Sequence, residues 1–123
     1  MAMRRPTGQD RRMVPAADAR PKPKRRQAKA PLQPERSFQN QVLQYARLRG
    51  WRAYHTWASL HSAGGFPDLV LVRRPRVVFA ELKREDRGPT RLQAEWLDDL
   101  QASKQEVYLW RPSNWPEIER VLQ

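Results

Sequence analysis

The sequence predicts a mixed α/β fold, in which helices flank a central β-sheet of mixed strand direction in the order α-β-β-β-α-β-α. Two apolar runs, Leu69–Val72 and Val77–Ala80, flank a short polar break and predict a β-hairpin. Both runs are apolar at consecutive positions, which is typical of strands that helices cover on both faces. A further strand, Glu106–Trp110, follows a helical segment. A crossover connection should make it parallel to the strand before that helix.

A helix is predicted at the start of the folded part. Pro34 suits the first helical position, and Ser37 is the alternative N-cap. Apolar residues follow at helical spacing, and Gly50 is suited to ending the helix. With the earlier start, Glu35 shares the inward face with Phe38.

The next segment, Trp51–Trp57, alternates large and polar side chains and predicts a strand. Within it, His55 is expected to be a packed strand residue rather than a metal ligand, because no second His has ligand spacing. Ala58–Gly65 is a loop of small residues, and the two glycines that close it permit close backbone approach. His61 and Ser62 are candidate phosphate contacts in this loop, although an ordinary flexible connection explains it as well.

The C-terminal part predicts two more helices. Thr90-Arg91-Leu92-Gln93 has the form of a capping box, so a helix should begin at Arg91. Gln93 is either the reciprocal cap or a side chain that reaches a metal or a phosphate, since anions bind at helix N-termini. A final short helix is predicted over Asn114–Leu122. Three aromatic residues are expected in the core rather than as platforms for bases: Trp96, Trp110 and Trp115.

The hairpin register brings charged residues together. If the turn is Arg73–Arg76, Val72 pairs with Val77. Counting back along both strands then places Asp68 opposite Glu81, with Cβ atoms about 4.5–5.5 Å apart.

Lys83 joins these two carboxylates, because strand alternation places it on the same face as Glu81. Like charges directly opposite each other destabilise a sheet, so the facing carboxylates indicate a cation between them. The alternative is a solvated hairpin end in which Lys83 neutralises Glu81.

Charge is distributed unevenly along the chain. The 123 residues carry 24 Lys and Arg against 13 Asp and Glu, a net charge of +11, which favours a polyanionic partner. Residues 1–34 hold ten of these basic residues, six of the eleven prolines and no Trp, Tyr or Phe. A segment of this composition cannot form a core, so residues 1–34 are predicted to be a disordered basic arm and 35–123 the folded domain. The arm is expected to contact phosphates, most densely through Lys22, Lys24, Arg25 and Arg26.

Composition also limits the compartment and the class of metal. The chain has no cysteine, which excludes disulfides and cysteine-based zinc sites. No apolar run is long enough to span a membrane, and the N-terminus lacks a signal-peptide core. We therefore expect a cytoplasmic protein that is not secreted, located at a nucleoid or in the cytosol of a phage-infected host.

At the hairpin, the sequence resembles a nuclease superfamily. Pro67-Asp68 followed by Glu81-Leu82-Lys83 is similar to the PD-(D/E)XK motif. The string Gly65–Leu69 resembles the virus-type replication-repair nuclease (VRR-NUC) branch, as do Gln93…Trp96-Leu97 and Trp110-Arg111-Pro112. The resemblance covers roughly residues 35–123 and implies a restriction-endonuclease-like fold.

The resemblance implies a Mg²⁺- or Mn²⁺-dependent deoxyribonuclease. Asp68, Glu81 and the backbone carbonyl of Leu82 would hold the ion, and Lys83 would orient the attacking water. Glu35 would add a third carboxylate, since relatives carry a Glu ahead of a Phe-Gln pair like Phe38-Gln39. Two alternatives stay open: either Glu35 only complements the helix dipole, or Gln39 completes the site in its place. The full set of implied catalytic residues is Glu35, Asp68, Glu81, Lys83 and Gln93.

The same resemblance suggests branched DNA, such as a Holliday junction, as the substrate. A chain this small has little surface for recognising a branch alone, so a homodimer with paired sites is expected. Two alternatives come from other classes of protein: a catalytically silent DNA-binding module, and a basic structural protein associated with nucleic acid.

Overall fold

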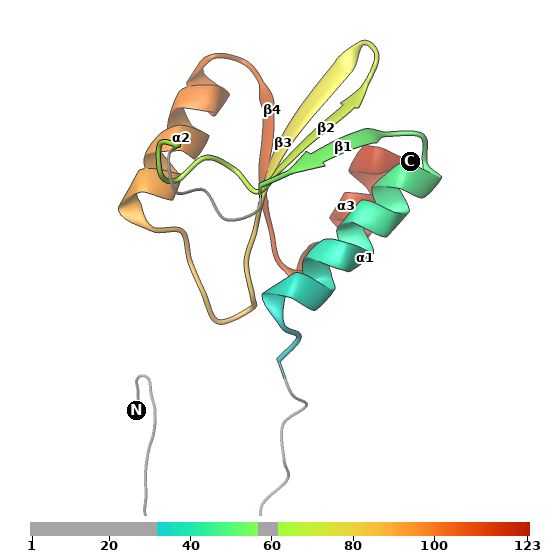
Figure 1. The fold of residues 1–123 in the computed structure, drawn as a ribbon, viewed down its shortest axis with the longest axis horizontal. Helices are drawn as coiled ribbons and strands as arrows, with labels where there is room; N and C mark the ends of the chain where they lie inside the picture. The colour runs from blue at the N-terminus through green and yellow to red at the C-terminus, as the bar shows by residue number, and fades with distance from the viewer. Residues whose placement is uncertain (1–31, 57–61) are drawn as a thin grey trace, which may run out of the picture. The chain divides into compact units, whose positions relative to one another are not determined.

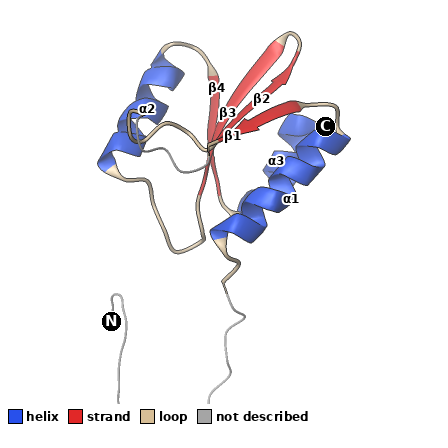
Figure 2. Ribbon diagram, in the orientation of Figure 1, coloured by secondary structure: helices blue, strands red, loops and turns tan. Residues whose placement is uncertain are grey.

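The computed structural model describes residues 32–56 and 62–123 (Figure 1), and its helices and strands follow the predicted order (Figure 2). The elements are α1 (Glu35–Leu48), β1 (Arg52–His55), β2 (Leu69–Arg73), β3 (Arg76–Leu82), α2 (Arg91–Ala102), β4 (Glu106–Trp110) and α3 (Trp115–Leu122). A 3₁₀ turn, Pro112–Asn114, precedes α3, so the last helix begins one residue later than predicted.

The four strands form one mixed sheet in the order β1-β2-β3-β4. β1, β2 and β3 are antiparallel neighbours, and β4 runs parallel to β3. The predicted crossover is therefore confirmed, because α2 connects the two parallel strands.

Helices lie on both faces of this sheet, as the apolar hairpin strands predicted. α1 and α3 lie on one side, and α2 lies on the other (Figure 1). The face under α1 and α3 holds the main core, which is made of Phe38, Val42, Leu43, Ala46, Trp51, Leu69, Leu71, Val78, Ala80, Leu82, Trp110, Ile118 and Leu122.

The second face is covered less completely. No residue of α2 is fully buried, and Leu92 of its predicted apolar stripe is 48% exposed. Trp96 is half-buried, whereas Trp110 on the first face is completely buried. Only the first face therefore forms a closed core.

The N-terminal helix begins where the earlier of the two predicted starts placed it. Pro34 is its N-cap rather than its first helical residue, and Ser37 lies inside the helix. At the other end, Gly50 has a φ of +88°, a left-handed conformation that favours glycine. The predicted stop is thereby confirmed.

Two boundaries differ from the predictions. β1 spans only Arg52–His55, and Trp57 lies outside the described residues. Arg73 pairs with Arg76, so the hairpin connection consists of Arg74 and Pro75 alone, joined by a cis peptide bond.

Among the described helices, none is long and apolar enough to cross a membrane.

Candidate functional site

Two carboxylates lie at the base of the β2–β3 hairpin, where the sequence predicted them. Val72 pairs with Val77 and Leu69 with Ala80. The same register places Asp68, just before β2, opposite Glu81 in β3.

Glu81 is the buried acid of this site. Its side chain is 1% exposed, and its Oε2 lies 3.5 Å from Nζ of Lys83. Its other oxygen, Oε1, is buried and has no hydrogen-bond partner among residues 32–56 and 62–123. Burial, and then the charge of Asp68, raise the pKa of Glu81 from 4.5 to about 7. Near pH 7, Glu81 is therefore a buried carboxylate whose negative charge is only partly balanced by its neighbours.

Asp68 is held by the backbone on both sides. Its Oδ2 accepts a hydrogen bond of 2.9 Å from the amide of Leu82, and its carbonyl accepts one of 3.1 Å from the amide of Thr56. Burial raises the pKa of Asp68, and this outweighs the opposing effect of the Leu82 amide. Asp68 is thus fixed in position while its negative charge remains incompletely compensated.

The loop that delivers Asp68 is anchored on α2. Gly65 has a φ of +90°, and a Cβ on it would lie 2.7 Å from the carbonyl carbon of Leu92. Only glycine fits this approach. The indole N–H of Trp96 donates to the carbonyl of Gly64 over 3.2 Å. The close approach that the paired glycines predicted is confirmed, and its surface is the first turn of α2.

Phe66 completes this anchor. Its ring packs edge-on against Trp96 at 5.0 Å between centroids and against Phe79 of β3 at 6.1 Å. The residue two positions before Asp68 is thereby fixed between the helix and the sheet.

Glu35 lies at the first turn of α1 with an exposed side chain. Its charge contributes to raising the pKa of Asp68, after the effect of burial. Among the described residues, however, no three His, Asp or Glu side chains gather closely enough to hold a metal ion. The structure brings together Asp68, Glu81 and Lys83, and the charge of Glu35 acts on Asp68. Gln39 is half-buried in α1.

Gln93 forms the predicted capping box. Its backbone N–H donates to Oγ1 of Thr90 over 3.2 Å, and its side-chain Oε1 accepts a hydrogen bond of 2.9 Å from the backbone N–H of Thr90. The cap interpretation is confirmed, and the side-chain oxygen is used in it.

Most of the residues predicted to contact phosphates lie outside the part of the chain that the structure describes. His61 and the four basic residues of the arm, Lys22, Lys24, Arg25 and Arg26, lie outside the described residues. Ser62 is described and exposed. His55 is half-buried in β1, opposite Leu69.

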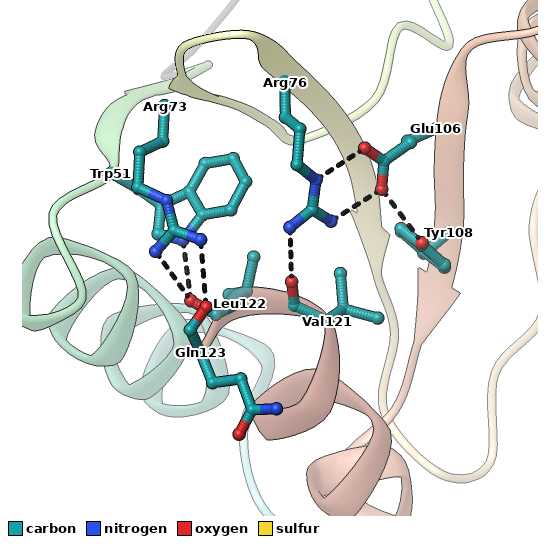
Figure 3. A network of polar contacts seen from close by, with 8 residues as sticks. All are labelled: Trp51, Arg73, Arg76, Glu106, Tyr108, Val121, Leu122 and Gln123. Atoms are coloured by element: carbon teal, nitrogen blue, oxygen red, sulfur yellow. Dashed lines mark hydrogen bonds and ion pairs between the residues drawn. The ribbon is translucent and has the colours of Figure 1, made fainter.

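A second cluster of charges lies at the opposite end of the hairpin, and sequence reasoning missed it (Figure 3). Arg76 donates two hydrogen bonds to Glu106, of 2.8 and 2.7 Å, and one of 3.0 Å to the carbonyl of Val121. Arg73 donates to the carbonyls of Arg49, Leu122 and Gln123 over 2.8 to 3.3 Å.

Trp51 lies between these two arginines. Its ring is 4.6 Å from the guanidinium carbon of Arg73 and 5.1 Å from that of Arg76, and its N–H donates to the carbonyl of Leu122 over 2.8 Å (Figure 3). The cluster therefore caps the C-terminal carbonyls of α3, where cations are favoured. The residues that it joins are far apart in the sequence, which is why no local pattern indicated it.

Of the two clusters, only the one at the base fits a bound cation. Its donors are carboxylate oxygens, which suit Mg²⁺ or Mn²⁺. The buried Oε1 of Glu81 lacks a partner in the described part of the chain, and both carboxylates have raised pKa values. A divalent cation would correct both deficits.

Comparisons with known proteins do not identify the chain: no family model, no curated protein and no solved structure matches it.

Proposed function

We propose that this chain is a metal-dependent deoxyribonuclease that hydrolyses phosphodiester bonds through Asp68, Glu81 and Lys83. The observation that carries the proposal is the buried, incompletely partnered Glu81 facing Asp68 beside a lysine. Two carboxylates with raised pKa values that share one site are typical of catalytic centres. The similarity of these positions to the PD-(D/E)XK motif, and a restriction-endonuclease-like arrangement of the sheet, belong to the same proposal.

Asp68 and Glu81 would hold Mg²⁺ or Mn²⁺, and the resemblance adds the carbonyl of Leu82. When bound, the cation polarises the scissile phosphate and lowers the pKa of a water molecule. Glu35 would act on this site through its charge, since it lies outside the pair.

Lys83 has a separate task. Its side chain is only 12% exposed, and its ammonium lies 3.5 Å from Oε2 of Glu81. The backbone amide of Lys83 donates a hydrogen bond of 3.0 Å to the carbonyl of Trp110, which fixes the backbone of Lys83 next to the site. There it would orient the attacking water and offset the negative charge that develops on the phosphate. A partly buried cation is effective for this purpose, because water screens it little.

The partner is proposed to be DNA, and branched DNA in particular, bound by a homodimer. The net charge of +11 supports a polyanionic partner. A two-fold dimer would present two sites to the two strands of a junction.

The test is incubation of the purified full chain with linear, flapped and four-way DNA, in Mg²⁺, Mn²⁺ or EDTA. We expect cleavage with either metal, none in EDTA, and the fastest cleavage on branched DNA. Asp68→Asn is the matched control, since it keeps the shape of the side chain and removes a ligand. Cleavage that persists in this variant, or wild-type protein that cuts no DNA with metal, would refute the proposal.

A further inference from the structure

Tyr54 is an exposed aromatic residue on the same face of the sheet as the candidate site. It pairs with Val70, which pairs with Phe79. Side chains of paired residues point to the same face of a sheet. Phe79 contacts Phe66, which contacts Trp96 of α2, so this row lies on the face that α2 covers. Asp68, two residues before Val70, shares that face.

Tyr54 also lies close to the carboxylates along the strand. The register of β1 and β2 continues to Thr56 opposite Asp68, and the amide of Thr56 donates to the carbonyl of Asp68 over 3.1 Å. Tyr54 is two residues from Thr56, which is roughly 6.6 Å along a strand. Tyr54 therefore lies two residues along the same sheet face from the place that the proposed function assigns to the scissile phosphate.

The surroundings of Tyr54 differ from those of an aromatic residue in a core. Its side chain is 62% exposed, although the partners in its row, Val70 and Phe79, are half-buried. Arg52, two residues further along β1 on the same face, is exposed as well. A single exposed aromatic residue is ordinary. An exposed ring in line with a guanidinium and a candidate phosphate site forms the surface on which single-stranded nucleic acids bind.

We infer that Tyr54 stacks on an unpaired nucleobase next to the phosphate that a cation bound by Asp68 and Glu81 would hold. This inference rests on the proposed function and narrows its substrate to DNA with a single-stranded nucleotide at the cleavage position. Bases inside a duplex are stacked on each other and offer no free face to the ring. Arg52 lies where it can attract the next part of the phosphate backbone.

The test measures stacking without cleavage. Full-length wild type, Tyr54→Ala and Tyr54→Phe are titrated in EDTA with a single-stranded oligodeoxynucleotide that contains 2-aminopurine, whose fluorescence falls when the base stacks. The same oligonucleotide in a duplex is titrated in parallel. Leu48→Ala is the matched control, because Leu48 is 79% exposed and lies on α1, away from this face.

Tyr54→Ala should bind the single strand on the order of ten-fold more weakly and lose the fluorescence change. Tyr54→Phe should retain both, and neither variant should alter duplex binding. Equal binding by wild type and Tyr54→Ala, equal losses in Tyr54→Ala and Tyr54→Phe, or equal losses on single strand and duplex would each overturn the inference.

A second experiment compares DNA cleavage by wild type and by Tyr54→Ala in Mg²⁺. Wild type that shows stacking dependent on Tyr54 but cuts no DNA with Mg²⁺ would refute the nuclease proposal, and with it the placement of the base next to a cleaved bond. Wild type that cleaves while Tyr54→Ala stacks and cleaves normally would refute the role of Tyr54 alone.

Discussion

The two ends of the β2–β3 hairpin carry opposite kinds of charged cluster. At the tip, Arg76 and Glu106 form a paired set of hydrogen bonds, and Glu106 also accepts one of 3.2 Å from the hydroxyl of Tyr108. At the base, Glu81 has one lysine at 3.5 Å and a buried oxygen that lacks a partner among the described residues.

The pKa shifts express this difference. Hydrogen bonding to Arg76 lowers the pKa of Glu106, and the same contact raises that of the arginine, so both groups hold their charges firmly. Burial raises the pKa of Glu81 and of Asp68, so these two groups are driven toward their neutral forms. The tip is organised for stability, whereas the base retains charges at a cost in stability, as a binding or catalytic centre does.

The largest expected effect comes from removing Lys83. Lys83→Met keeps most of the side-chain stem and deletes the ammonium. Loss of one electrostatic contact to the transition state should lower the cleavage rate by about 100- to 1,000-fold, while DNA binding in EDTA stays within about twofold. Single-turnover cleavage and gel-shift titration measure the two quantities. A wild-type rate in Lys83→Met would show that the base of the hairpin is as structural as the tip.

The second effect concerns pH and stability at the base. The folded protein binds a proton at Glu81 more tightly than the unfolded chain does, because the pKa rises from 4.5 to about 7 on folding. The resulting stabilisation is complete below pH 4.5 and is lost as the pH rises through 7, which amounts to roughly 3 kcal/mol. Metal-free wild type should therefore lose stability over this range by roughly that much more than Glu81→Gln.

Urea denaturation of both proteins at pH 4.5, 6 and 8 measures this difference. Mg²⁺ should restore stability to wild type at pH 8 and have little effect on Glu81→Gln, because the cation favours the charged carboxylate. Parallel pH profiles for the two proteins would show that Glu81 does not titrate as its burial implies.

The smallest effect is expected at the tip. Arg76→Met removes the hydrogen bonds to Glu106 and Val121 and the contact with Trp51. Because both members of the Arg76–Glu106 pair are about one-third exposed, water screens their attraction, and we expect a loss of about 1–2 kcal/mol.

Thermal melting and single-turnover cleavage distinguish the tip from the base. Arg76→Met should melt lower but cleave at the wild-type rate per folded molecule. The exposed Arg74, in the turn itself, provides the control: Arg74→Met should change stability by less than about 0.5 kcal/mol. Slower cleavage in Arg76→Met, or equal destabilisation by both variants, would remove the distinction between the two ends.

Local signals in the sequence predicted much of this structure. The pairing of Val72 with Val77, the capping box at Thr90 and Gln93, and the left-handed Gly50 each depend on neighbours a few residues away. Such features follow from strand alternation, turn length and backbone conformation, which short stretches of sequence determine. The opposition of Asp68 and Glu81 belongs with them, because a hairpin register fixes it.

The role of Glu35 shows where such reasoning ends. Helical spacing placed it on the inward face with Phe38, yet Phe38 is buried and Glu35 is exposed. Periodicity specifies a direction around the helix axis but not what lies there. The position of α1 on the sheet decides whether the carboxylate reaches the site.

The sequence by itself determined which charges meet at the base of the hairpin, because register is local. Only the tertiary structure decided how deeply those charges are buried and which groups surround them. Glu81 is buried by packing between distant segments, and the Asp68 loop is anchored on α2. Arg73 and Arg76 donate hydrogen bonds to the C-terminal end of α3, which is also distant along the chain. Burial and partnering set the energy of a charge, and both depend on how helices and sheet pack together.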